Sequence, residues 1–268
     1  MWNTPSKLSI MKILMIGDVV GSPGRRAVKE VVARLKAAGL ADVVVANGEN
    51  AAGGRGLTAP LAEELFGYGV DVITTGDHTW DQSGFESYMN SQPRLVRPAN
   101  YVPGVPGRGM TVVQSAFGPV RVICLQGRTF MKVCDCPFRT IDSLLAEPAP
   151  PGLVTVVDMH AEATSEKIVM GRYLDGRVTA VAGTHTHVQT SDECILPQGT
   201  AYITDLGMTG PRDSSLGRDL ESVTAMFLTG RPAKFKIAKL DPALEGVVID
   251  VDRKTARARG IQRIRELL

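Results

Sequence analysis

Short apolar runs alternate with amphipathic segments along the N-terminal third of the chain. The run KILMIGD (12–18) ends in Gly-Asp, which is typical of a buried strand. Residues 21–39 follow with apolar positions at helical spacing and a glycine at the end. Further strands are expected at 42–50 and 71–78, with a helix between them that Thr58 can cap. This order predicts an α/β fold in which helices cover both faces of a parallel sheet.

The alternation resumes in the second half of the chain and ends in antiparallel strands. A Gly/Pro-rich loop at 95–109 interrupts it, and PAPPG (148–152) is the clearest linker. The other expected elements are, in order, a hairpin at 110–116 and 120–126, a helix at 139–146, a strand at 153–160, a helix at 164–173, a strand at 178–188, a hairpin at 195–204, a helix at 217–228, a strand over KFKIAK (234–239) and strands at 246–252 and 256–264.

Length and composition fit a globular protein. The chain has 268 residues, of which 44% are apolar and 22% charged, enough for one large domain with a sizeable core. We expect that domain over 11–268 and an N-terminal extension over 1–10, because Met11 can serve as a start. The formal net charge is only +2, which argues against a partner bound mainly through charge, so no stable DNA binding is expected.

Sequence features favour the cytoplasm and give no sign of a membrane partner. No run reaches the ~18 apolar residues that a membrane helix needs. The first ten residues, MWNTPSKLSI, lack the basic-then-apolar layout of a signal peptide. The four cysteines have neither zinc-finger spacing nor a disulfide framework, and we expect reduced thiols at Cys124, Cys134, Cys136 and Cys194.

Each apolar strand of the parallel part ends in side chains that can bind a metal ion. These strand ends carry Asp18; Glu49 and Asn50; Asp77 and His78; Asp158 and His160; His185 and His187. All four histidines of the chain are among them. Ligand sites of open α/β sheets lie beyond the carboxyl ends of the strands, so these side chains are expected to converge. Any one of them is more often a core residue, turn former or helix cap, but the agreement of five strand ends favours a site.

Carboxylates, an amide oxygen and imidazoles form a ligand set for two metal ions. Seven or eight such ligands exceed the four that one zinc ion usually takes. Oxygen and nitrogen ligation without thiolate suits manganese, iron or zinc. Two such ions can activate a hydroxide and clamp the oxygens of a displacement at phosphorus. We expect His185 and His187 to serve different ions or different shells of the site.

The motifs around these strand ends resemble those of the calcineurin-like metallophosphoesterases. They are GD (17–18), NGEN (47–50), GDHTWD (76–81), DMHAEATSEK (158–167) and GTHTHVQT (183–190). Four more stretches are similar to the YmdB-like bacterial branch: IGDVVGSPGR (16–25), VRPANY (96–101), LQGRTF (125–130) and YITDLGMTGP (202–211). The resemblance extends from about Met11 to the C-terminus. It implies a four-layer α-β-β-α sandwich with mixed sheets, a dinuclear iron, manganese or zinc centre, and hydrolysis of small phosphodiesters, notably 2′,3′-cyclic AMP.

The resemblance also implies a role for eight side chains. The ligands of the first ion would be Asp18, His187 and, in an assisting role, Asn50. The ligands of the second ion would be Asp77, His160 and His185, with Glu49 as the bridge between the ions. The residue facing the substrate would be His78, which would act as general acid towards the leaving oxygen or stabilise charge on the phosphate.

Two positions depart from the pattern of the superfamily. Asp18 is followed by two valines in place of Asp-x-His, so the first site lacks an imidazole and Asn50 is the nearest substitute. Asp77 stands where the pattern has asparagine, which adds a negative charge. We expect tighter metal binding by a less electrophilic ion. A regulatory nucleotide- or partner-binding protein with little hydrolysis is therefore an alternative, and a phosphomonoesterase is another because it shares the ligand set.

Several arginines outside the expected ligand set have two interpretations each. Arg55, Arg97 and Arg128 lie in Gly/Pro-rich loops, where they can clamp a phosphate or lie on the surface without a fixed partner. Four more share one parity near the C-terminus, which favours a charged edge strand over RNA binding: Arg257, Arg259, Arg263 and Arg265. A homo-oligomer is expected only because such assemblies are common.

Overall fold

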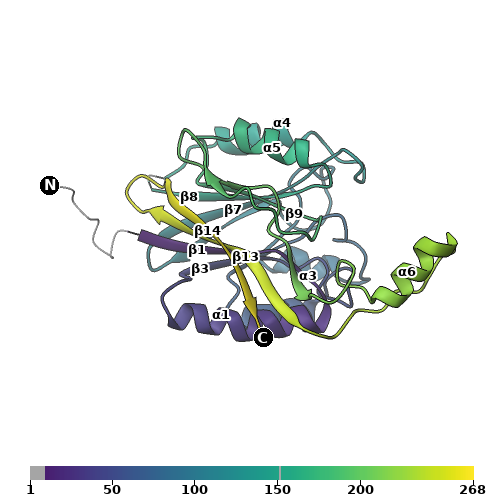
Figure 1. The fold of residues 1–268 in the computed structure, drawn as a ribbon. Coiled ribbons are helices and arrows are strands. Elements are labelled where there is room, and N and C mark those ends of the chain that lie inside the picture. The colour runs from purple at the N-terminus through teal and green to yellow at the C-terminus, as the bar shows by residue number, and fades with distance from the viewer. Residues whose placement is uncertain (1–9, 151) are drawn as a thin grey trace.

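Two mixed β-sheets lie face to face in the computed structural model, which describes residues 10–150 and 152–268 (Figure 1). The first sheet contains, in order, β2 (Asp18–Val19), β12 (Met208–Pro211), β13 (Pro242–Asp252), β1 (Ile10–Ile16), β3 (Val43–Asn47), β4 (Val72–Thr74) and β5 (Leu95–Val96), with β14 (Ala258–Leu267) paired to β13. The second contains β10 (Cys194–Ile195), β11 (Ala201–Ile203), β9 (Ala180–Thr184), β8 (Val154–His160), β7 (Gly118–Gln126) and β6 (Met110–Ser115).

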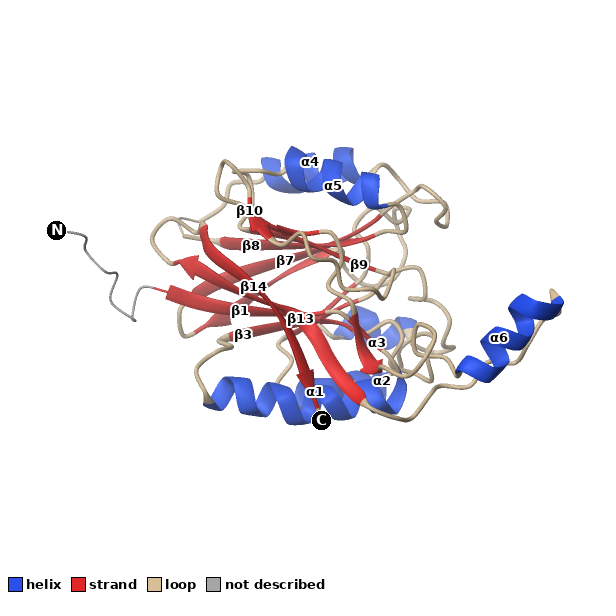
Figure 2. Cartoon of the chain, in the orientation of Figure 1, coloured by secondary structure: helices blue, strands red, loops and turns tan. Residues whose placement is uncertain are grey.

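Helices cover the outer faces of both sheets (Figure 2). Those against the first sheet are α1 (Gly21–Ala37), α2 (Ala59–Gly67) and α3 (Glu86–Ser91). Those against the second sheet are α4 (Pro137–Ala146) and α5 (Thr164–Tyr173). The last helix, α6 (Leu220–Thr229), projects from the body of the molecule. The architecture is the four-layer sandwich with mixed sheets, so the predicted fold class is confirmed.

Alternate residues of β1 divide the core between two layers, as the two-residue period of a strand requires. Leu14 and Ile16 belong to the apolar cluster beneath α1 and α2. Ile13 and Met15 belong to the cluster between the two sheets. A third apolar cluster lies between the second sheet and its helices. The strands β1, β3 and β4 are parallel, as are β7, β8 and β9, so their carboxyl ends define one edge of each sheet.

Several predicted elements differ from the structure, including the strands expected at 42–50 and 178–188, which end at Asn47 and Thr184. The strand expected at 71–78 ends after Thr74, and the following residues form the site loop described below. KFKIAK is not a strand, and within it Ile237 makes only an isolated bridge with Arg218. The helix expected at 217–228 begins at Leu220, because the Asp219 side chain accepts a hydrogen bond from the Ser222 amide and caps it there.

The C-terminal arginines lie in the edge strand β14 or next to it, and several of them form ion pairs with acidic side chains. β14 pairs with β13 and, within the described residues, with no other strand. Arg259 binds Asp252, and Arg265 binds Glu245 with its Nε 2.6 Å from Oε1. The ion pairs support a structural role for these side chains.

The described residues contain no helix that is both long enough and apolar enough to cross a membrane. Residues 1–9 of the expected extension lie outside the described ranges, and Ile10 is already part of β1, where it pairs with Asp252.

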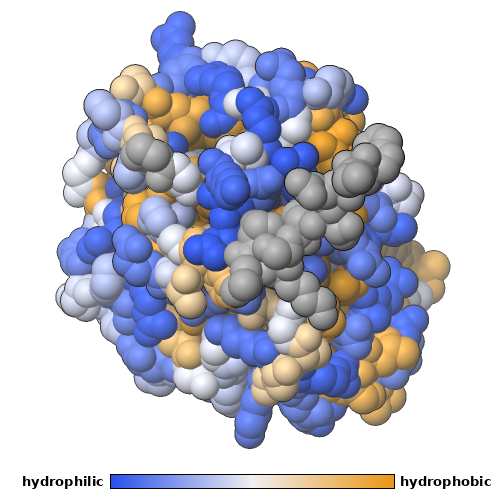
Figure 3. Space-filling view, turned by 90° about the vertical axis from the view of Figure 1, so that its left-hand side faces the viewer, coloured by the Kyte–Doolittle hydropathy of each residue, from blue (hydrophilic) through white to orange (hydrophobic). Residues whose placement is uncertain are grey.

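The face at the amino-terminal ends of the parallel strands is shown in Figure 3, where hydrophilic residues predominate and hydrophobic ones are scattered among them.

Candidate metal centre

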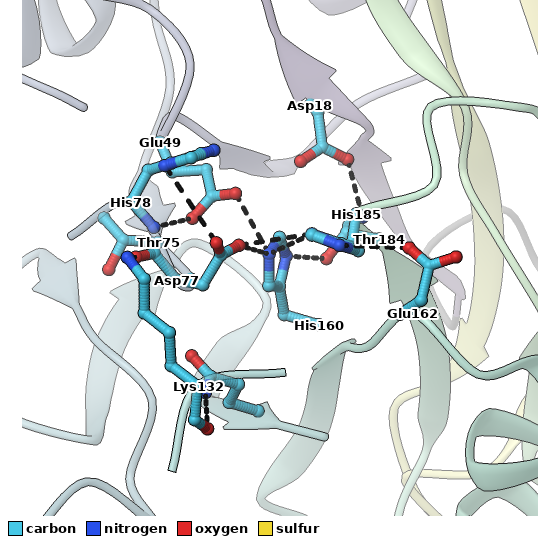
Figure 4. A network of polar contacts seen from close by, with 12 residues as sticks. Asp18, Glu49, Thr75, Asp77, His78, Lys132, His160, Glu162, Thr184 and His185 are labelled. Carbon is cyan, nitrogen blue, oxygen red and sulfur yellow. Dashed lines mark hydrogen bonds and ion pairs between the residues drawn. The ribbon is translucent and has the colours of Figure 1, made fainter. Parts of the chain in front are cut away.

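Loops at the carboxyl ends of the strands bring the predicted side chains together (Figure 4). They come from the start of β2 (Asp18), the loop after β3 (Glu49 and Asn50), the loop after β4 (Asp77 and His78), the end of β8 (His160) and the loop after β9 (His185 and His187). Asp18, Glu49, Asn50 and His160 are buried. The site thus joins the edges of both sheets.

Four of these side chains form a compact group of ligand atoms. One atom each from Glu49, Asp77, His160 and His185 lies within 4.8 Å of the others. The Nε2 atom of His160 lies 3.0 Å from Oε1 of Glu49 and 3.2 Å from Oδ1 of Asp77. The Nδ1 atom of His185 lies 3.2 Å from the same Asp77 oxygen and 3.1 Å from Nε2 of His160. Two imidazoles and two carboxylates directed at one point fit a transition-metal ion.

A second group lies around Asp18. Its Oδ1 atom and Oδ1 of Asn50 are buried and accept no hydrogen bond from any described residue. Buried oxygens without a donor are rare in folded proteins, and a bound cation accounts for both. His187 places its Nε2 atom 3.7 Å from Oδ1 of Asp18. The residues therefore fit a second metal ion, separate from the first group, to which Glu49 belongs.

Burial shapes the protonation of this second group. It raises the pKa of the Asp18 carboxyl to about 7 and lowers the pKa of the His187 imidazole to about 4. A neutral imidazole is the form that binds a metal, and a cation would restore the ionised form of the carboxyl. Burial also acts to raise the pKa of Glu49, but the adjacent His160 outweighs it and lowers that pKa.

A chain of hydrogen bonds behind His160 fixes its ring. Its Nδ1 atom lies 2.8 Å from the Thr184 hydroxyl, which donates to Oδ1 of Asp158 at 2.6 Å. The other Asp158 oxygen accepts from the Thr74 hydroxyl. Gly76 packs directly on the ring, since a Cβ atom there would lie 2.2 Å from Cδ2 of His160. Asp158, which ends a strand as predicted, therefore orients a ligand from behind.

The backbone turns sharply at both histidines of the loop after β9. His185 has φ 94° and His187 has φ 61°, so the segment is not extended and the two side chains do not share one face as residues two apart in a strand would. The two rings therefore point to different groups, with His185 towards Asp77 and His187 towards Asp18. Such φ values are strained for residues with a Cβ atom and persist where the surroundings hold them. Asp205 contributes by accepting hydrogen bonds from the amide and hydroxyl of Thr186.

His78 lies beside the metal ligands with its ring held by an acid. Its amide donates to Oε2 of Glu49 at 3.0 Å, and its Nδ1 atom is 2.7 Å from Oδ2 of Asp81. Arg55 donates to the same Asp81 oxygen at 2.7 Å. Asp81 was given no role from the sequence, although it ends the motif that contains His78. Glu162 was missed as well, and its Oε2 atom lies 3.2 Å from Nε2 of His185.

The arginines with two interpretations have different surroundings. Arg97 donates to the carbonyls of Pro98 and Pro106 and so stabilises its own loop. Arg55 is engaged by Asp81 at the edge of the site. Arg128 is held through its amide by Glu166. All four cysteines are free.

A cavity of about 380 Å³ opens beside the metal ligands. Glu49, Asn50, His78, His185 and His187 line one end of it. This volume lies in the range of small-molecule sites. Polar groups that bind metal at the end of a ligand-sized cavity are typical of an active site.

The sequence profile of the YmdB-like protein family matches residues 14–264. The chain belongs to the YmdB-like family. A Bacillus subtilis (strain 168) relative named 2′,3′-cyclic-nucleotide 2′-phosphodiesterase is 51% identical over 254 residues, which cover 95% of this chain and 96% of the relative. The resemblance to the calcineurin-like metallophosphoesterases that was drawn from the motifs is confirmed.

Two solved structures are similar to this chain over nearly the full length of both proteins. The crystal structure of a hypothetical protein from Thermus thermophilus is similar with a TM-score of 0.90 and 40% identity, over 96% of this chain and 99% of the other. That of a novel phosphatase from Mycoplasma pneumoniae is similar with a TM-score of 0.90 and 35% identity, over 96% of this chain and 94% of the other.

Proposed function

We propose that this YmdB-like protein is a cytoplasmic, metal-dependent phosphodiesterase that hydrolyses 2′,3′-cyclic nucleotides such as 2′,3′-cyclic AMP. The observation that carries the proposal is the meeting of two metal-ligand groups with His78 at one end of a ligand-sized cavity. The B. subtilis relative named for 2′,3′-cyclic nucleotides supports the choice of substrate. Four free thiols agree with a reducing compartment.

The ligands would divide into two groups, one for each ion. One ion would be held by Asp77, His160 and His185, the other by Asp18, Asn50 and His187, with Glu49 between them. Iron, manganese or zinc bound there would supply an activated water and neutralise charge on the phosphate. Asp158 and Thr184 keep the His160 ring in the orientation in which Nε2 faces the ligand group.

His78 would carry the proton to the leaving oxygen. With Nδ1 held by Asp81, Nε2 is the ring atom left to donate the proton to the leaving oxygen. The Glu49 carboxylate fixes the backbone of His78 beside the metal ligands. The phosphodiester would therefore lie between the ligand groups and the His78 ring.

Metal analysis combined with hydrolysis assays tests the proposal. Purified protein should contain about two metal ions per chain and hydrolyse bis-p-nitrophenyl phosphate and 2′,3′-cyclic AMP when manganese is added. Two metals without turnover would leave a binding or regulatory role. Absence of bound metal after incubation with manganese, iron and zinc would show that the ligand groups do not form a metal centre.

A phosphomonoesterase is the second candidate, and the M. pneumoniae structure described as a novel phosphatase favours it. The same assay with p-nitrophenyl phosphate distinguishes the two. A larger kcat/KM for the monoester than for the diester would replace the diesterase proposal.

A further inference from the structure

The cavity beside the metal ligands has two chemically different ends. The metal end carries the carboxylates, amide and imidazoles already described. The other end is apolar and comes from the segment 215–238, which contains α6 and is called the arm here. Its apolar lining residues are Leu216, Val223, Met226, Phe227, Phe235 and Ile237. In Figure 1 the arm projects beyond the sheets on the side of the site, where α6 is labelled.

Residues 217–219 and 236–238 pair through their backbones where the arm leaves the body of the protein, and these two segments are called the neck here. Their pairing fixes the apolar end of the cavity. The Asp219 amide donates to the Lys236 carbonyl at 3.0 Å, and the Ala238 amide donates to the Gly217 carbonyl at 3.0 Å. The Asp219 carboxylate accepts from the Lys236 amide as well as capping α6. The two segments of the neck thereby bring Phe235 and Ile237 to the side of the cavity.

Ile237 connects the arm to the loop after β3, which carries Glu49 and Asn50 and is called the metal loop here. A Cβ atom at Gly54 would lie 2.5 Å from Cδ1 of Ile237, so the isoleucine packs directly on the glycine. The Gly54 carbonyl in turn accepts a hydrogen bond from the Asn50 side chain at 3.2 Å. The apolar wall is therefore in contact with the loop that supplies a metal-end oxygen, and the two ends form one continuous site.

The chemistry of the apolar end suits a flat ring with polar edges. The Arg218 guanidinium lies over the Phe235 ring, 4.5 Å from its centre, so a planar cation and an aromatic ring stack at this end of the cavity. The acidic residues lining the cavity, Glu49 and Glu162, lie at the metal end. Phe227 is 78% exposed although it lines the cavity, so it offers apolar area that an occupant can cover.

We propose that the apolar end of the cavity binds the nucleobase of the substrate, with Phe235 and Phe227 as its apolar contacts and Arg218 at its edge. The inference rests on the proposed function, because it assumes a nucleotide whose phosphate lies at the metal end. Stacking on aromatic side chains is tolerant of base identity, so purine and pyrimidine substrates should both be accepted.

Kinetics with and without a base test this proposal. The wild-type protein, Phe235→Ala, Phe227→Ala and the control Leu228→Ala are compared on 2′,3′-cyclic AMP and on glycerol 1,2-cyclic phosphate, which lacks a base. Leu228 is 81% exposed on the same helix as Phe227 and does not line the cavity. We expect Phe235→Ala to lower the kcat/KM for 2′,3′-cyclic AMP relative to that for glycerol 1,2-cyclic phosphate about tenfold, or about 1.4 kcal/mol, through a higher KM for the nucleotide. Leu228→Ala should leave this ratio unchanged.

A ratio that is the same in all four proteins would overturn the subsite. If Phe235→Ala does not fold by circular dichroism, Phe227→Ala decides, because its exposed side chain contributes little to stability. Adenosine binding, measured calorimetrically on the manganese-loaded protein, separates this proposal from the enzymatic one. Should neither substrate be hydrolysed while adenosine binds wild type and not Phe235→Ala, the subsite stands and the activity fails. Hydrolysis of both substrates at equal kcat/KM without adenosine binding would leave the activity standing and overturn the subsite.

Discussion

The Lys167 ammonium lies 2.7 Å from Oδ2 of Asp205, and both side chains are buried. The same Asp205 oxygen accepts hydrogen bonds from the amide and hydroxyl of Thr186, which lies between the two histidines of the proposed metal centre. The ion pair therefore connects α5, in the outer layer, to the loop that carries His185 and His187. The positions of the His185 and His187 rings therefore depend on the Lys167–Asp205 ion pair, although neither of its side chains is a predicted metal ligand.

Removing one partner of this pair should destabilise the protein. Lys167→Met leaves the Asp205 carboxylate buried without its cation, which typically costs about 3–5 kcal/mol of the free energy of unfolding. The double variant Lys167→Met/Asp205→Asn removes the uncompensated charge and should recover part of that loss. Urea denaturation of both variants and of Asp205→Asn alone measures the effect. Additive losses in the double variant would show that the two residues are not coupled.

His78→Ala should separate metal binding from turnover. The residue lies outside the compact ligand group, so the metal content should match that of the wild type, while kcat for 2′,3′-cyclic AMP falls about 10²–10⁴-fold. Asp81→Asn, which keeps the shape but loses the charge beside Nδ1, should give a smaller decrease. Metal analysis and steady-state kinetics on the same samples give both values. Full turnover in His78→Ala would remove this residue from the mechanism.

Gly76→Ala should weaken metal binding through a steric effect on one ligand. Its Cβ atom would lie 2.2 Å from the His160 ring and must displace it, so we expect metal affinity to fall on the order of 10–100-fold. Gly67→Ala is the matched control, because no atom lies within 4 Å of the added carbon. Competition with a chelating dye reports the affinities. Equal affinities in both variants would mean that His160 is not a ligand.

Asp77→Asn tests what the extra carboxylate does. The amide lacks the charge but keeps an oxygen, so we expect weaker metal binding and a higher kcat at saturating manganese. Titration calorimetry gives the affinity, and initial rates at saturating metal give kcat. If kcat falls instead, the aspartate is adapted to this site and the regulatory alternative loses its support.

Local patterns predicted the buried strands and the edge at which their polar ends meet, whereas the four-layer arrangement with two sheets was implied by the family resemblance. Runs such as KILMIGD identify buried strands and their ends, and parallel strands place those ends together. Asp81 could have been found, since it lies three residues after His78 in the same motif. Asp205 could not be paired with Lys167, because the contact joins segments 38 residues apart and depends on the packing of α5 on the second sheet.

The arm shows a different limit. KFKIAK has the alternation of a strand, and only the backbone pairing at the neck shows that Ile237 faces the metal loop rather than a sheet. A pattern of apolar positions indicates which side chains are buried, but it does not indicate which segment of the chain packs against them. In this segment the contact is a loop of the site, so the functional meaning of Phe235 could not be read from sequence.

Metal removal should lower thermal stability through the second ligand group. Three carboxylates, Asp18, Glu49 and Asp77, lie in one site, and Asp18 and Asn50 have oxygens without donors among the described residues. Metal at about 1,000 times its Kd contributes about 4 kcal/mol to the folded state. For a chain of this size that corresponds to a rise in Tm of about 10 °C.

Differential scanning calorimetry after chelation and after return of manganese measures this shift. Asp18→Asn should reduce the rise and lower the metal content, because the neutral amide is the weaker ligand. Asp250→Asn, a half-exposed position paired with Lys12 on the first sheet, serves as the control and should keep the full rise. The same Tm with and without metal would show that the buried oxygens of Asp18 and Asn50 have another partner.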